Sequence, residues 1–146
     1  MLKSHYRDYA TAAFRLLARE GSADRYRARV YNTALARRGD GGAGLGSPTE
    51  AAIMRAEQAV YDTVATIADL EAAEYAVAAL EARYGYAARR ALYMVYMAYA
   101  DRELAKGEIS ERIHRAELEI PASEKTLYRW LAYARRCFAE KRGLRI

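Results

Sequence analysis

The stretch GEISERIHRAELEIPASEKTLYRWLAYARRCFAEKRGL, from Gly107 to Leu144, is the part of the chain that predicts the fold most clearly. In its first half, apolar residues recur at i, i+4, i+7 and i+11, the spacing of one helix face. These residues are Ile109, Ile113, Ala116 and Ile120. Pro121 lacks a backbone donor and disfavours helical dihedrals at Ile120, so the helix should end there. Ser123 is then placed to cap a second helix, which predicts two helices joined by a tight turn.

The second helix, residues 123–142, has one apolar face and one cationic face. Its inner stripe comprises Leu127, Leu131, Ala134 and Phe138, with Trp130 beside it. Its outward positions are Lys125, Tyr128, Arg129, Ala132, Arg135 and Arg136. These are the parts of a helix-turn-helix, which lays its second helix in the DNA major groove. The alternative is a basic amphipathic hairpin that packs in a helical bundle, because a charged strip is often only a solvated face.

We expect the DNA contacts to come from the first turns and the exposed face of this second helix. The candidate residues are Ser123, Lys125, Thr126, Tyr128, Arg129, Arg135 and Arg136. Arg129 and Lys125 suit phosphates or guanine edges, and Tyr128 suits the DNA backbone or a thymine methyl group. Two positions depart from the common pattern, because Pro121 stands where the turn usually has glycine and Glu117 stands where helix contact usually favours alanine.

The segment S-E-K-T-L-Y-R-W, followed by a helix rich in alanine, arginine and aromatic residues, resembles a known module. It is similar to the C-terminal region of small phage-encoded transcription regulators of the ArpU or late-gene-activator type. Those in turn resemble the promoter-reading region of bacterial sigma factors. The resemblance covers Ala79 to Leu144 and implies binding to double-stranded DNA through Lys125, Thr126, Tyr128, Arg129 and Arg136. It also allows RNA polymerase as a partner, although the sequence shows no contact surface for one.

The N-terminal part, residues 1–38, is predicted to form a basic helical arm. Residues 4–20 have a helical apolar stripe, Gly21 is a stop signal, and Ser22 can cap a second helix that runs to about Arg38. The glycine-rich segment GDGGAGLG, residues 39–46, follows as a flexible linker, so the arm is a candidate for a mobile or swapped element. Its glycines formally match a dinucleotide-binding pattern, but they follow a helix where that motif requires a strand.

The middle part, residues 47–106, is predicted to form long helices that supply a core and a possible self-association surface. Ser47 as N-cap, Pro48 at the first position and Glu50 as its partner form a capping box. A spacing of seven residues separates Ile53, Val60 and Ile67. The same spacing separates Leu70, Val77 and Tyr84. That spacing suits a helix seam within one chain or between two. Gly85 should break the helix, and a further helix should run from Tyr86 to Lys106.

Composition narrows the class of protein further. With 146 residues, a net charge of +5 and no alternating strand patterns, the chain is predicted to be an all-α helical bundle that suits an anionic partner such as nucleic acid. The single cysteine, Cys137, allows no internal disulfide and favours a reducing cytoplasm. The first ten residues, MLKSHYRDYA, contain no apolar h-region, so no secretory signal is expected. The longest apolar run, Ala91–Ala100, would rise about 15 Å as a helix against a bilayer core of about 30 Å, so no membrane span is expected.

Catalytic and metal-binding patterns are poor. The single Glu111-x-x-His114 motif lacks the second motif and the further glutamates that a di-iron bundle needs, so we expect no metal, no cofactor and no enzymatic activity. Three functions remain open. They are a sequence-specific DNA-binding transcription regulator that self-associates as a homo-oligomer, a small terminase-like packaging component that forms a ring, and a helical protein-interaction module without DNA binding.

Overall fold

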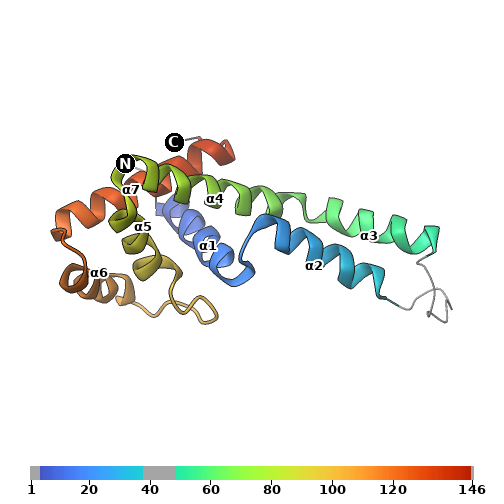
Figure 1. The fold of residues 1–146 in the computed structure, drawn as a ribbon, viewed down its shortest axis with the longest axis horizontal. Helices are drawn as coiled ribbons and strands as arrows, with labels where there is room; N and C mark the ends of the chain where they lie inside the picture. Colours follow the sequence, from blue (N-terminus) through green and yellow to red (C-terminus); the bar gives the residue numbers. More distant parts are fainter. Residues whose placement is uncertain (1–3, 38–48, 146) are drawn as a thin grey trace.

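The computed structural model describes residues 4–37 and 49–145 and confirms the all-α prediction. Most of these residues are helical, and none of them forms a strand. The helices are arranged as a body with a projecting pair of helices (Figure 1). In chain order they are α1 Ser4–Glu20, α2 Ala23–Leu35, α3 Glu50–Asp62, α4 Val64–Tyr84, α5 Tyr86–Leu92, the π-helical turn η1 Tyr93–Met97, α6 Glu108–Glu119 and α7 Glu124–Arg142.

The body has one hydrophobic core, to which both ends of the chain contribute. Phe14 of α1 and Phe138 of α7 are fully buried, and their ring centroids lie 6.1 Å apart. The core also contains Leu70 and Leu80 of α4 and Leu92 of α5. Residues 4–20, which the sequence placed in a separate arm, therefore belong to the central packing and are not a detachable segment of this structure.

Helices α2 and α3 form an antiparallel hairpin that extends away from the body (Figure 1). The Ser22 hydroxyl caps α2 by accepting from the backbone N–H of Arg25 at 3.0 Å, as predicted. Gly21 ends α1 with a φ of +86°, a conformation that glycine adopts without strain. The helix ends at Leu35, three residues before the predicted Arg38, which lies outside the described residues together with the glycine-rich linker.

The start of α3 differs from the prediction. Thr49, and not Ser47, is the N-cap: its hydroxyl accepts from the backbone N–H of Ala52 at 3.1 Å, and the helix begins at Glu50. Ser47 and Pro48 lie outside the described residues. The long helix expected from here to Tyr84 is interrupted at Thr63, whose hydroxyl donates to the carbonyl of Val60 at 2.9 Å. Gly85 ends α4 as predicted, with a φ of +91°.

The sequence predicts a helix over Tyr86–Lys106, which is confirmed from Tyr86 to Met97 and is wrong beyond Met97. The helix ends with η1 at Met97, and at Ala98 the backbone becomes extended, with φ −64° and ψ 140°. Tyr99 then adopts the left-handed region, with a φ of +54° that is uncommon outside glycine. The carbonyls freed by this early exit need donors from elsewhere in the chain. Two buried arginines supply them, as described below.

The C-terminal pair of helices is close to the prediction. α6 ends at Glu119, Ile120 has extended dihedrals, and the Ser123 hydroxyl caps α7 by accepting from Thr126 N–H at 3.2 Å. The predicted inner residues Ile113, Ala116 and Ile120 of this pair are buried, as are Leu127, Leu131, Ala134 and Phe138, whereas Ile109 and Trp130 are partly buried. The helices and the turn are thus confirmed as secondary structure, whereas their identity as a DNA-binding helix-turn-helix stays a prediction. Within the described part of the chain, no helix is both long enough and apolar enough to span a membrane.

Candidate nucleic-acid interface

The candidate interface is the outer face of α7, a helix that is capped at its start and tied to the body of the protein at its end. At its start, Ser123 forms the cap and its Oγ also lies 3.1 Å from Oγ1 of Thr126. At its end, Arg142 Nε donates to Asp69 Oδ1 of α4 at 2.7 Å. The Tyr9 hydroxyl of α1 donates to the same oxygen at 2.5 Å. Burial, followed by the neighbouring Asp69 carboxylate, raises the pKa of Tyr9 above its ordinary value. Helix α7 is therefore fixed rather than free to swing.

The predicted outward residues except Arg135 are exposed in the structure and lie along one side of α7. We define the α7 strip as Lys125, Tyr128, Arg129 and Arg136. Lys125 and Arg129 form no ion pair or hydrogen bond with any residue that the structure describes. Arg136 lies 4.0 Å from Glu140, and both side chains are well exposed, so this contact contributes little. The charges of the strip are thus available to an anionic partner.

Three of the seven predicted DNA-contact residues have other tasks in the structure. Ser123 and Thr126 are engaged with each other in the cap of α7. Arg135 is half-buried, and its Nη1 donates to the hydroxyl of Tyr96 at 2.5 Å, which ties α7 to η1. We therefore assign Arg135 a structural role and leave it out of the α7 strip.

Beside the strip, a groove of about 660 Å³ runs between α7 and α4 and adds a cation that the sequence did not single out. Arg83 of α4 lines this groove together with Arg129 and Arg136. Its guanidinium lies over the rings of Tyr84 and Tyr133, 5.4 and 5.2 Å from their centroids, which orients it. The sequence does not indicate that Arg83 belongs to this face, because nothing local shows that α4 lies against α7.

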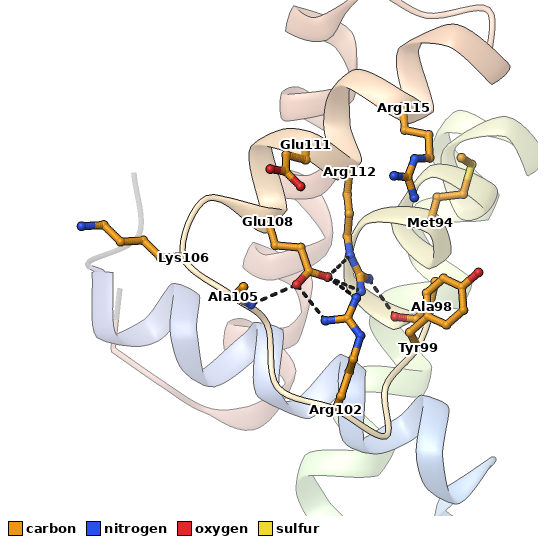
Figure 2. A pocket seen from close by; sticks show the side chains of 10 residues that line it. All are labelled: Met94, Ala98, Tyr99, Arg102, Ala105, Lys106, Glu108, Glu111, Arg112 and Arg115. Atoms are coloured by element: carbon orange, nitrogen blue, oxygen red, sulfur yellow. Dashed lines mark hydrogen bonds and ion pairs between the residues drawn. The ribbon is translucent and has the colours of Figure 1, made fainter.

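A second cluster of charges, at the start of α6, is paired internally. Figure 2 shows the Glu108 carboxylate between the guanidinium groups of Arg102 and Arg112. Arg102 donates to both of its oxygens at 2.8 Å, and the backbone N–H of Ala105 donates at 3.0 Å. These donors, Arg102 first, hold the pKa of Glu108 well below its usual range. The adjoining cavity of about 220 Å³ is therefore bordered by groups that hold the loop in place.

The loop after η1 is held by two buried arginines. Arg112 Nη1 donates to the carbonyl of Ala98 at 2.8 Å, and Arg15 donates to the carbonyls of Tyr96 at 2.8 Å and Tyr99 at 2.9 Å. The sequence identifies neither arginine as structural, because an arginine on a basic helix is usually a surface residue and its buried partners are distant in the chain. Their charges are directed inwards and do not contribute to the α7 strip.

Glu111 and His114, the Glu-x-x-His pair of the sequence, do not lie in one cluster. Glu111 lines the cavity at Arg112, whereas His114 lies with Glu117 and Glu124, so that one ligand atom of each falls within 4.8 Å of the others. All three residues are exposed. Two carboxylates therefore lie at the start of α7, and they limit the positive surface there.

Comparison of the chain with protein-family models, with curated proteins and with solved structures gave no match. A function must therefore be inferred from the residues of the chain itself.

Proposed function

We propose that this chain binds double-stranded DNA with the α7 strip in the major groove, as a sequence-specific transcription regulator of the phage type. The observation that carries the proposal is the strip itself, in which Lys125 and Arg129 are exposed cations without a partner among the described residues, with Tyr128 between them. A helix that offers free Arg and Lys side chains on one face suits phosphates and guanine edges.

The dimensions of the strip support this proposal. From Lys125 to Arg136 the helix rises about 16 Å, and its neighbour Arg83 widens the cationic surface on the side of α4. A major groove about 12 Å wide accepts one helix along such a length. Glu124 and Glu140 flank the strip at its two ends, so contact should be confined to the residues between them.

A comparison of the ion pairs of α2 with those of the α7 strip supports α7 as the interface. Arg27 pairs with Asp24 at 2.8 Å and with Glu71 at 3.3 Å, and Arg29 pairs with Glu20 at 2.7 Å. Acidic neighbours therefore offset much of the charge on α2, whereas the α7 strip has one such pair, at 4.0 Å. Contact of the strip or of any other surface with RNA polymerase stays a prediction.

The test is fluorescence anisotropy of labelled DNA of about 30 base pairs, titrated with the protein across a salt series. Neutralising three to four phosphates per copy predicts a slope of log affinity against log salt of about −3 to −4. Competition with unlabelled DNA of mixed sequence then measures specificity. Absence of binding at low salt would reject the proposal and leave the α7 strip as a solvated face or a protein-binding surface.

A further inference from the structure

The buried residues of the projecting hairpin of α2 and α3 are all alanines. They are Ala23, Ala34, Ala52 and Ala56. All of the largest fully buried side chains of the described residues lie elsewhere in the protein. Burial of alanine contributes little apolar area, and a 13-residue helix is marginal on its own in water. The outer half of this hairpin therefore needs another surface to pack against.

Helix α3 offers such a surface, which we call the arm face: Ile53, Met54, Val60, Tyr61 and Val64. Ile53 and Val60 are half-buried and lie seven residues apart, on one line of the helix. Met54 and Tyr61 directly follow these two residues in the sequence, so they are also seven residues apart. They are 63% and 72% exposed. Val64, at the start of α4, is 60% exposed. Apolar residues in such a line on a projecting helix mark an interaction site.

The charges of the hairpin favour another copy of the same hairpin as the occupant. Three arginines against one aspartate give α2 a net charge of +2, and three acids against one arginine give α3 a net charge of −2. The two helices together are neutral, although the whole chain has a net charge of +5. Two such hairpins meet without net repulsion, and α2 of one copy complements α3 of the other.

We propose that the arm face is a homodimer interface, in which the hairpins of two copies form an antiparallel four-helix bundle. In a two-fold arrangement centred near Gln58, Met54 of one copy packs on Tyr61 of the other, and the reverse contact follows from the symmetry. This arrangement covers the exposed apolar residues of both copies at once. It is independent of DNA binding, and it would present two α7 strips from one particle.

The first test is the mass in solution by sedimentation equilibrium, without DNA. The chain of 16.4 kDa should give a dimer of about 33 kDa. Tyr61→Lys should shift it to the monomer, because a charge would enter an apolar interface twice. Tyr86→Lys is the matched control, since Tyr86 of α5 is also 72% exposed but lies in the body. This control variant should remain dimeric.

The second test does not depend on weakening the interface. Gln58→Cys should form a covalent dimer under mild oxidation, because two thiols at the axis would lie within disulfide range. The native Cys137 is buried and should not react. Ala132→Cys on the exposed face of α7 is the control and should stay uncrosslinked. A wild-type monomer, a ring of many copies, or cross-linking that does not distinguish positions 58 and 132 would overturn the proposal.

Discussion

Arg15 and Arg112, from α1 and α6, hold the same unwound segment after η1. Arg15 donates to the carbonyl of Tyr96 at 2.8 Å and Arg112 donates to that of Ala98 at 2.8 Å. Both arginines are about 6% exposed. Their guanidinium groups therefore donate hydrogen bonds to carbonyls that, in an uninterrupted helix, would accept from backbone N–H groups.

Arg15→Ala should destabilise the fold by about 2–3 kcal/mol, because it leaves buried carbonyls of the loop without donors. Urea unfolding followed by circular dichroism measures this loss. Arg115→Ala is the control, since Arg115 lies on the exposed side of α6 and should change stability by less than about 0.5 kcal/mol. Equal stability of the two variants would show that the loop does not depend on Arg15.

The ion pairs of Glu108 predict a pH dependence of stability. The pKa of Glu108 is lowered in the folded state, so its contribution is fully present above its ordinary value of 4.5 and is lost as the pH falls below it. The stability difference between wild type and Glu108→Gln should therefore shrink between about pH 5 and about pH 3. Glu111→Gln is the control at an exposed neighbouring carboxylate. A difference that stays constant over this range would contradict the assignment.

Local sequence signals predicted the elements whose ends are set by neighbouring residues. Gly21 and Ser22, Gly85, and Pro121 with Ser123 each place a boundary where the structure has one. The early end of the helix after Tyr86 was missed because its cause is tertiary. Arg15 is 81 residues from Tyr96 in the sequence, and no local pattern reports that contact.

The sequence predicts only part of the candidate site, because local patterns do not report tertiary contacts. Helical periodicity alone places Lys125, Tyr128 and Arg129 on the outside of α7, and the structure agrees. Periodicity does not show that Arg135 reaches Tyr96, nor that Arg83 lies beside Arg136, because both relationships need the packing of α7 on the body. The cap of α3 is Thr49 where the sequence predicts Ser47, because both residue types suit an N-cap and they lie only two positions apart.

Arg129→Ala should weaken DNA binding about 5- to 100-fold at constant salt, because it removes an exposed cation at the centre of the α7 strip. Its unfolding free energy should stay within about 0.5 kcal/mol of wild type. Anisotropy and urea unfolding of the same preparation check both values. Arg25→Ala, an exposed arginine of α2, is the control and should leave the affinity nearly unchanged.

Arg83→Ala should test whether the surface extends from α7 onto α4. Loss of one phosphate contact should make the slope of log affinity against log salt less steep by about one, with similar effects on all DNA sequences. Arg89→Ala is the control, because Arg89 is paired with Glu81 at 2.9 Å. An unchanged slope in Arg83→Ala would confine the interface to α7.

The most direct test of the central claim compares two variants that lose the same charge from different helices. One carries Lys125→Gln, Arg129→Gln and Arg136→Gln on the α7 strip, and the other carries Arg25→Gln, Arg27→Gln and Arg29→Gln on α2. Each has three positive charges fewer than wild type, so a non-specific effect of net charge weakens DNA binding equally in both. If α7 is the interface, only the first variant should lose binding by 100-fold or more at physiological salt, while both remain helical. Equal losses, or a larger loss from the α2 variant, would contradict the assignment of the interface to α7.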